Sequence, residues 1–204
     1  MDGKEHWEGV YRNKAADAVS WYRSHLDTSL RLIDENAPDR NAAIIDVGGG
    51  ESTLVDDLLQ RGYRNLTVLD MSAVALDTAK QRLGSIAEQV TWVESDIMVV
   101  DLPEHRYDVW HDRAVFHFLT EPSQRHAYTR LLTRTLKQGG RVVIATFGPQ
   151  GPNRCSGLDV RRYDVQLLSD EFGPGFELVT STLEDHHTPA GSSQQFLYCS
   201  FRKL

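Results

Sequence analysis

Three consecutive glycines follow an apolar run in IIDVGGGEST, the segment from Ile44 to Thr53. Glycine weakens any strand or helix that contains it, because it loses more conformational freedom on folding than any other residue. A tight turn needs one glycine, or two at most. The third glycine therefore indicates a turn at which a ligand comes into close contact with the backbone.

Around this turn, short apolar runs alternate with longer amphipathic ones as far as residue 172. That order predicts an α/β fold with a doubly wound, mostly parallel sheet and helices on both faces. The turn-rich segment 185–193 is too short for a helical crossover, so the last strand should pair antiparallel. The expected strands span 42–47, 66–70, 90–96, 107–112, 141–147, 176–184 and 193–202, and the expected helices span 52–62, 72–84, 123–140 and 162–172.

The residues before the first strand have a helical pattern and are rich in large aromatic side chains. We find no linker and no internal repeat that would divide the chain. The expectation is a single domain over 1–204, with an N-terminal helical cover at 1–40 and an α/β core at 41–204. The aromatic residues of this cover are Trp7, Tyr11, Trp21 and Tyr22.

Charge and cysteine usage exclude several classes of protein. With 22 Lys and Arg against 29 Asp and Glu, the net charge of −7 argues against a surface that coats nucleic acid. No stretch reaches the ~18 apolar residues of a membrane span, and the N-terminus lacks a signal-peptide pattern. Cys155 and Cys199 lack metal-ligand spacing and are expected to be reduced thiols. These features predict a cytoplasmic protein with no metal, no nucleic-acid partner and no membrane partner.

The candidate ligand contacts lie just after strands, at the edge where open α/β sheets bind ligands. Gly48, Gly49 and Gly50 form the first strand–helix turn. Asp70 ends the second strand, 22 positions after Gly48, a spacing that suits a carboxylate bound to ribose hydroxyls. Asp96 ends the third strand. Together these residues predict a nucleoside site.

The residues after the glycines indicate which nucleoside cofactor the turn would bind. A nicotinamide-cofactor turn, G-x-G-x-x-G, requires glycine at the position of Thr53, and no G-K-S or G-K-T follows to make a P-loop. Glu51 would repel a phosphate but suits the sulfonium cation of S-adenosylmethionine. A reductase would also need a pair such as Tyr-x3-Lys, and no tyrosine has lysine four residues on. An adenosyl ligand with a cationic sulfur fits best.

With these residues in place, the sequence resembles the class I S-adenosylmethionine-dependent methyltransferases. IIDVGGGES is similar to the first motif of that family, with Ser52 in place of its third glycine, and LTVLDMS resembles the second motif. VESDI resembles the third motif, YDVWHDRAVFHFLT the fourth-strand motif, and LKQGGRVVIATF the glycine turn before strand five. The resemblance extends from Ala42 to the C-terminus and implies a Rossmann-like, seven-stranded core whose seventh strand is antiparallel.

The resemblance also implies which residues bind the cofactor. Asp70 would bind the ribose, and Met71 and Asp96 would contact adenine. Each has a structural alternative, since Asp70 can stabilise a helix N-terminus, Asp96 can be a turn acid and Met71 can belong to the core. The cofactor-binding residues expected from this resemblance are Asp46, Gly48, Gly49, Gly50, Asp70, Met71, Asp96, Ile97, His111 and Trp21.

The end of the fourth strand lies beside the first, where the transferable methyl group is expected. His111, Asp112 and Arg113 are candidates there for the methionine amino and carboxylate groups or for the substrate, although Arg113 could equally be a structural ion-pair partner. If the acceptor is a hydroxyl or an ammonium group, a base is required, and His117 is the first candidate and Asp112 the second. A thiolate or a neutral amine would need neither.

Three further segments have expected roles. The aromatic residues of the cover, Trp21 among them, could lie against the sulfonium, where a cation–π contact contributes ~0.5–2 kcal/mol; the alternative is an amphipathic helix docked on the sheet. His186 and His187 are expected in a solvated turn, or else as a base at the acceptor. The loop after strand five is expected to be mobile, with Arg154 placed to meet an anionic acceptor.

These patterns leave several functions open. The leading hypothesis is a methyltransferase for a small-molecule acceptor, because a compact chain with short insertions offers mostly a pocket. The alternative is a protein-lysine methyltransferase, motivated by the N-terminal segment and the acidic charge. A nicotinamide-dependent reductase and a non-catalytic adenosyl-binding protein are less favoured. The acceptor atom and the oligomeric state stay open.

Overall fold

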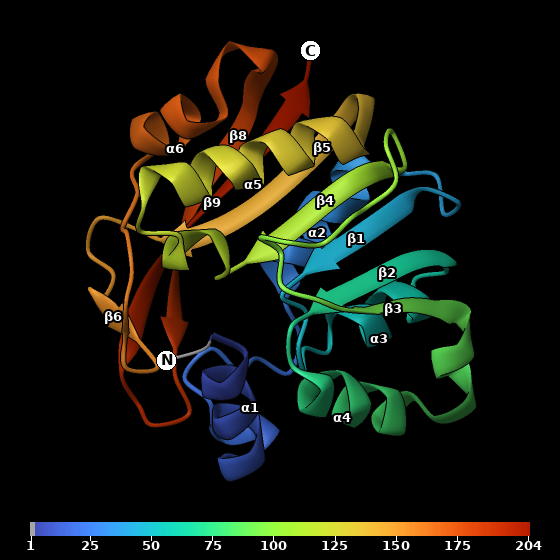
Figure 1. Ribbon diagram of the computed structural model, residues 1–204, viewed down its shortest axis with the longest axis vertical. Helices are drawn as coiled ribbons and strands as arrows, with labels where there is room; N and C mark the ends of the chain where they lie inside the picture. Colours follow the sequence, from blue (N-terminus) through green and yellow to red (C-terminus); the bar gives the residue numbers. More distant parts are fainter. Residues whose placement is uncertain (1–2) are drawn as a thin grey trace.

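A seven-stranded sheet forms the centre of the protein, whose computed structural model describes residues 3–204 (Figure 1). Its strands are β1 (Ala43–Val47), β2 (Asn65–Asp70), β3 (Val90–Glu94), β4 (Tyr107–Arg113), β5 (Leu136–Phe147), β8 (Phe176–His187) and β9 (Ser193–Lys203). A separate hairpin consists of β6 (Arg154–Cys155) and β7 (Leu158–Asp159). The helices are α1 (Gly3–Asn13), α2 (Asp27–Asn36), α3 (Leu54–Gln60), α4 (Ala73–Leu83), α5 (Pro122–Thr135) and α6 (Val165–Phe172), with short 3-10 helices at Ala16–Ala18, Gly84–Gln89, Phe116–Phe118 and Gly173–Gly175.

The strand order in the main sheet is β3-β2-β1-β4-β5-β9-β8. All neighbouring strands pair in parallel except those that include β9, which is antiparallel to both β5 and β8. The predicted mostly parallel sheet with an antiparallel last strand is confirmed. Because the chain winds one way from β1 to β3 and the other way from β4 onward, the switch point lies between β1 and β4. In such sheets ligands bind at that point, beyond the carboxyl ends of the strands.

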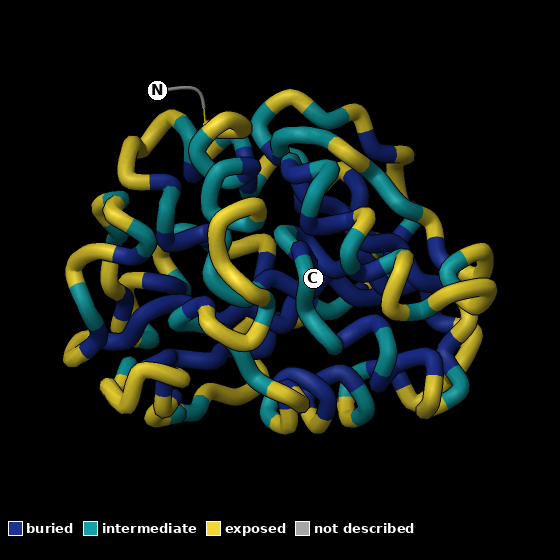
Figure 2. The backbone as a smooth tube through the Cα atoms, turned by 90° about the horizontal axis from the view of Figure 1, so that it is seen from below, coloured by how far each residue is buried: buried dark blue, intermediate teal, exposed yellow. Residues whose placement is uncertain are grey.

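The strands separate two apolar cores. Ile44 of β1 packs on one face with Ile33 of α2 and Leu58 of α3. The next residue, Ile45, belongs to the opposite core, which includes Leu132 of α5 and residues of α6. All residues of β1 are buried, as expected for a parallel strand covered on both sides. Figure 2 shows the same arrangement, with buried segments inside and exposed segments around them.

The ends of α4 are those that the sequence predicts. The hydroxyl of Ser72 accepts the N–H of Ala75 at 3.2 Å and caps the first turn. Gly84 ends the helix with φ of 59°, a left-handed value that favours glycine. Local capping chemistry thus defines both ends of this helix.

Two other local predictions are wrong, and a third segment contains an element that was not predicted. The helix expected over 123–140 ends at Thr135, because the residues from Leu136 onward pair with β4 and belong to β5. The turn expected at 185–193 is shorter, since β8 continues through His186 to His187. The loop after β5 contains the β6–β7 hairpin. In each case backbone pairing with another strand extends or creates an element that the residue pattern did not indicate.

Residues 3–24, which we call the N-terminal cover, lie at the carboxyl ends of the central strands, with α1 beside α4 (Figure 1). The predicted cover at 1–40 also included α2, but Leu30 and Ile33 of α2 are buried in the core of the sheet. The segment over the strand ends is therefore shorter than expected. No helix among residues 3–204 is long and apolar enough to cross a membrane.

Candidate functional site

The glycine turn after β1 is packed tightly against protein atoms. Gly48 and Gly50 have φ of 67° and 49°, in the left-handed region that favours glycine. A Cβ on Gly48 would lie 2.0 Å from the side chain of Val115, and a Cβ on Gly50 would lie 2.6 Å from the hydroxyl of Tyr11. Close contact with these protein atoms therefore explains why both positions are glycine, without any ligand. The sequence alone indicated a ligand as the cause.

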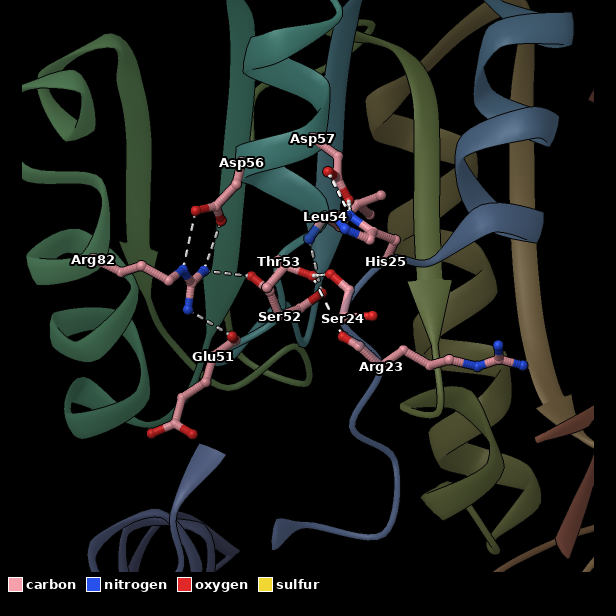
Figure 3. Close-up of polar contacts among 10 residues, drawn as sticks. All are labelled: Arg23, Ser24, His25, Glu51, Ser52, Thr53, Leu54, Asp56, Asp57 and Arg82. Carbon is pink, nitrogen blue, oxygen red and sulfur yellow. Dashed lines mark hydrogen bonds and ion pairs between the residues drawn. The ribbon is translucent and has the colours of Figure 1, made fainter. Parts of the chain in front are cut away.

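Polar contacts hold the segment after the glycines in place (Figure 3). Arg82 of α4 donates to the backbone carbonyls of Glu51 and Ser52 at 2.9 and 2.7 Å. The hydroxyl of Thr53 donates to the carbonyl of Ser24 at 2.9 Å and connects the turn to the cover. The carboxylate of Glu51 points away from these contacts. The turn is thus rigid, while one acidic side chain is left for another partner.

The larger of two cavities lies beside the turn and has a volume of about 260 Å³. One side consists of the ends of β1, β2 and β3, and the other consists of the cover and the residues that follow β4. This is the switch-point edge at which the sequence analysis places a nucleoside. The predicted residues that line the larger cavity are Gly48, Asp70, Met71, Asp96, Ile97 and Trp21.

The two predicted strand-end acids are both held in turns. An Oδ1 atom of Asp70 accepts the N–H of Ser72 at 2.8 Å, so the helix N-terminus alternative is realised. Burial raises the pKa of this carboxyl to about 7, against the lowering effect of backbone N–H groups. Asp96 accepts the N–H of Met98 at 2.9 Å and is only half-buried. Each carboxylate still has oxygen lone pairs for a ligand in the larger cavity.

A smaller cavity of about 50 Å³ lies next to the larger one, and Asp46, Gly48, Gly49 and His111 line it. Both ring nitrogens of His111 are already used within the protein. Its Nδ1–H donates to Asp46 at 2.7 Å, because a carboxylate only accepts, and its Nε2 accepts from Ser29 at 2.9 Å. His111 and Asp46 therefore fix the floor of the smaller cavity, and the imidazole has no free nitrogen for a ligand.

The two candidate bases lie away from both cavities. His117 is fully buried, its Nδ1 accepts the N–H of Phe147 at 3.3 Å, and burial lowers its pKa to about 3. Asp112 is also fully buried and accepts from the N–H of Val115 at 2.9 Å and from the hydroxyl of Tyr128 at 2.5 Å. Side-chain alternation along β4 turns Asp112 toward α5. Neither group lines a cavity, so the geometry does not support the predicted role as general base.

Arg113 is the charged residue that β4 places at the junction of the two cavities, and it lines both. Its Nε donates to the hydroxyl of Tyr198 at 3.0 Å, and its Nη1 donates to the carbonyl of Trp21 at 2.9 Å. The expected alternative, an ion-pair partner, is not found among the residues that the structure describes. The guanidinium instead contacts a neutral hydroxyl, a backbone carbonyl and an aromatic ring.

Aromatic side chains of the cover form the far wall of the larger cavity. The ring of Trp7 lies 5.8 Å from that of Trp21 and 5.2 Å from that of Phe118, in both cases edge-to-face. Tyr11 and Cys155 complete this wall. The cover aromatics thus line the larger cavity and also pack on one another, so the predicted role at the sulfonium stays a prediction.

A polar cluster that sequence reasoning missed fastens the cover to β8. Arg23 pairs with Glu184 at 2.8 Å and donates from Nε to Nδ1 of His186 at 3.2 Å. The Nε2–H of His186 donates to the carbonyl of Ser20 at 2.7 Å. His186 is fully buried, and burial together with nearby arginines lowers its pKa. We call Arg23, Glu184 and His186 the latch. The sequence does not reveal this cluster, because Arg23 is some 160 residues away from the other two.

Residues 3–204 contain no group of three or more His, Cys, Asp or Glu side chains that could hold a metal ion. Cys155 and Cys199 are both free and buried. The site consists of strand-end acids, one unpaired arginine and aromatic rings.

This geometry and strand order have counterparts among known proteins. A family model described as a methyltransferase domain matches residues 44–140, the part that contains the glycine turn, Asp70 and Asp96. The chain has the fold of the class I S-adenosylmethionine-dependent methyltransferases. S-adenosylmethionine is therefore the cofactor of this methyltransferase, and a nicotinamide cofactor is no longer supported.

Curated relatives of this methyltransferase differ in what their names say they act on. Malonyl-acyl-carrier-protein O-methyltransferase of Paenibacillus is 30% identical over 154 residues, which cover 69% of this chain and 55% of the relative. An eEF1A lysine and N-terminal methyltransferase of Mus musculus is 25% identical over 140 residues, 68% of this chain and 20% of the relative. EEF1A lysine methyltransferase 2 of Danio rerio is 24% identical over 195 residues, 86% of this chain and 76% of the relative. The chain thus spans about half of the first relative and a fifth of the second.

Solved structures show the same fold. A 1,6-didemethyltoxoflavin-N1-methyltransferase from Burkholderia thailandensis, with S-adenosylhomocysteine bound, has a TM-score of 0.70 and 22% identity, covering 98% of this chain and 83% of that chain. A structure from work on thioacetal formation in echinomycin biosynthesis has a TM-score of 0.79 and 18% identity, covering 98% of this chain and 92% of that chain.

The residues of the two cavities fit the cofactor. Oε2 of Glu51, at the smaller cavity, is buried and has no hydrogen-bond partner among the described residues. Burial raises the pKa of this carboxyl, and the Thr78 hydroxyl and the Arg82 guanidinium offset that effect only in part. A cationic amino group there would supply a further compensating charge. The rings of Trp7 and Trp21 at the larger cavity suit a sulfonium cation.

Proposed function

We propose that this methyltransferase transfers the methyl group of S-adenosylmethionine to a small molecule bound beneath the N-terminal cover. The observation that carries the proposal is the larger cavity, which has strand-end acids on one side and cover aromatics on the other. A space of about 260 Å³ bounded on both sides suits a compact acceptor better than an extended polypeptide.

In this proposal the adenosyl part lies in the larger cavity against β2 and β3. Asp70 binds the ribose hydroxyls, and Asp96 with the N–H of Ile97 binds adenine, whose face lies on Met71. Glu51 pairs with the amino group of the methionine part. These assignments are supported by the position of each residue at a cavity wall and by the lone pairs left on each carboxylate.

The cofactor supplies an activated methyl group when it is bound. The protein then has to hold donor and acceptor in line and exclude water, and such positioning can contribute about 7–11 kcal/mol to a barrier. Trp7, Trp21 and Phe118 exclude water from the far wall. Asp112 fixes the backbone after β4 through the N–H groups of Val115 and Phe116, and is therefore a positioning residue in this proposal.

The proposal is tested by where the methyl group goes. The protein is incubated with S-adenosylmethionine labelled in its methyl group and with a cell extract, and the products are divided by ultrafiltration. We expect label in the small-molecule fraction, and none with an Asp70→Asn variant as the control. Label confined to protein would contradict the small-molecule assignment.

A protein-lysine acceptor is the second candidate, because the Danio rerio lysine methyltransferase aligns over 86% of this chain and 76% of its own length. For that function the cover would have to leave a channel for a lysine side chain between Trp7 and Phe118. Labelled protein bands that appear with the wild type and disappear with Asp70→Asn would support this candidate over the first.

A further inference from the structure

One terminal nitrogen of Arg113 has no partner. Its Nε and Nη1 hydrogen-bond to Tyr198 and to the carbonyl of Trp21, but Nη2 is buried and makes no hydrogen bond with any residue of 3–204. No carboxylate in that range lies within ion-pair distance of the guanidinium, which rests 4.5 Å from the ring centre of Phe196. A fixed cation therefore stands at the cavity junction without a counter-ion.

A buried charge without a partner is costly, and the cost is removed when a ligand brings the opposite charge. Tyr198 and Trp21 hold the guanidinium so that its unpaired N–H group is preorganised. Since arginine stays protonated at any pH at which the protein is folded, the missing partner is an anion.

We propose that Arg113 binds the methyl acceptor, and that the acceptor is a small acidic molecule that reacts as its anion, a thiolate, phenolate or enolate. This inference rests on the proposed small-molecule function and narrows it to a chemical class.

The surroundings of Arg113 favour the acceptor over the cofactor as the source of the anion. Its contacts come from the cover and from β9, on the side of β4 that faces the β6–β7 hairpin. At the proposed adenosyl position, Asp70 ends β2 and Asp96 follows β3, on the opposite side of the switch point. The acceptor has to approach from the side opposite the adenosyl leaving group, which is the side of Arg113.

The cavity offers no base on this side. Burial raises the pKa of the Tyr11 hydroxyl and of the Cys155 thiol, so both keep their protons at neutral pH. His117 and Asp112 do not reach the cavity. An acceptor that must lose a proton therefore has to bind as its anion. The adjacent guanidinium lowers the pKa of an acidic acceptor and so favours the anion.

The same charge disfavours the lysine candidate. An ammonium group beside Arg113 would meet a like charge with no carboxylate on the same wall. The rings of Trp7, Trp21 and Phe118 would offer it cation–π contacts, but they accept a flat neutral or anionic ring as readily through stacking and edge contacts.

The chemical step balances without a protein base. A lone pair of the acceptor anion forms a bond to the methyl carbon while the bond from that carbon to the sulfonium sulfur breaks. The electrons of the broken bond stay on the sulfur, which becomes the neutral thioether of S-adenosylhomocysteine. One negative and one positive charge are neutralised, and no proton is left over.

The test uses para-nitrothiophenol as the probe, because its thiolate and thiol forms differ in visible absorption. The wild type saturated with S-adenosylhomocysteine is titrated with the probe, and the probe's pKa is read from its absorption when bound. We expect a lower pKa bound than free, and about tenfold or greater loss of affinity in Arg113→Gln, as for loss of a charged hydrogen bond. Benzylammonium, the matched cation, should bind no better to the wild type than to the variant.

Two further variants distinguish the loss of this contact from misfolding and from a general change in charge. Arg113→Lys keeps the charge and should recover part of the probe affinity even if Arg113→Gln is poorly folded. Arg202→Gln removes one exposed positive charge far from the cavities, at the end of β9 paired with Glu177, and should bind the probe like the wild type. An unshifted probe pKa in the wild type, or equal affinity in Arg113→Gln, would overturn the inference.

The cofactor's own carboxylate is the rival partner, and it is separated by comparing two nucleosides. S-adenosylhomocysteine carries that carboxylate and methylthioadenosine does not. If Arg113→Gln loses affinity for S-adenosylhomocysteine alone and keeps the probe, Arg113 serves the cofactor and the inference is wrong. Methyl label that reaches only protein would refute the proposed small-molecule function, whereas label on small amines with no preference for acids would refute only this inference.

Discussion

The sheet and the N-terminal cover are held in place by different forces. Every residue of β1 is buried between two apolar cores. In α1 the buried residue is Glu8, whose carboxylate accepts the N–H of Ala73 at the start of α4 at 2.8 Å. The latch between Arg23 and β8 is also polar. Because the cover is attached through a few polar contacts and one aromatic cluster and not through a closed apolar core, we expect it to open more readily than the sheet unfolds.

The largest expected difference is in the free energy of unfolding. Ile45→Ala removes a fully buried side chain from β1 and should cost about 2–5 kcal/mol, because a cavity forms in a closed core. Trp7→Ala in the cover should cost less than about half of that, since its ring is only partly buried and faces a cavity. Urea denaturation of both variants measures this comparison. Equal losses would mean that cover and sheet form one cooperative unit.

Asp70 lies where the sheet meets the cavity beneath the cover, and Asp70→Asn should change cofactor affinity and protein stability in opposite directions. The variant should lose about tenfold or more in affinity for S-adenosylhomocysteine, because a charged hydrogen bond to the ribose is lost. Without ligand it should be more stable than the wild type above neutral pH. Calorimetry and thermal melts measure the two effects.

The sign of the second effect follows from the pKa of Asp70. Burial raises it from 3.8 to about 7 in the folded protein, so the folded state binds this proton more tightly than the unfolded chain does. Stability therefore falls as pH rises through the window between these values, and the penalty is complete above it. Asp70→Asn should lack this slope. An unchanged slope would contradict the assigned cause.

Opening the latch should change rates more than stability. Glu184→Gln weakens the ion pair with Arg23 and should lower the free energy of unfolding by about 1 kcal/mol or less. Release of S-adenosylhomocysteine should become faster, because the cover opens more often. Stopped-flow tryptophan fluorescence measures the release, with Glu35→Gln in the exposed pair with Arg31 as the matched control. Identical release rates in all three proteins would show that the cover does not limit exchange.

The smallest expected effect is at His117. A His117→Gln variant keeps a side-chain acceptor for the N–H of Phe147, and its turnover should stay within about threefold of the wild type, whereas removal of a general base costs about a hundredfold or more. With a folded pKa of about 3, the imidazole is neutral throughout the range of activity, so the pH–rate profile should not shift. A large loss of turnover with unchanged cofactor affinity would restore His117 as a base.

The same pKa has a consequence for stability. Burial lowers the pKa of His117 from 6.5 to about 3, so between these values the unfolded chain binds a proton that the folded protein does not. This group therefore destabilises the protein progressively as pH falls below 6.5. The glutamine variant should lose that part of the acid sensitivity, which acid titration followed by far-UV circular dichroism measures.

The elements that sequence analysis placed correctly are those that local chemistry determines. Ser72 and Gly84 bound α4, and the strand that ends at Asp70 contains the apolar residues Leu66, Val68 and Leu69. Side chains whose roles depend on distant partners could not be placed in this way. His186 was expected in a solvated turn and is instead buried against the cover, because β9 extends the pairing of β8.

The order of apolar runs, glycines and strand-end acids determined by itself the class of sheet and the edge at which the cofactor is expected. Periodicity and capping act over a few residues, so they can be recognised in a linear chain. Tertiary structure alone decided that His117 and Asp112 are sealed, that Arg113 is left with a free nitrogen, and that residues 3–24 close the cavity. Those outcomes depend on desolvation and on contacts between residues far apart in sequence, and a local sequence pattern predicts neither.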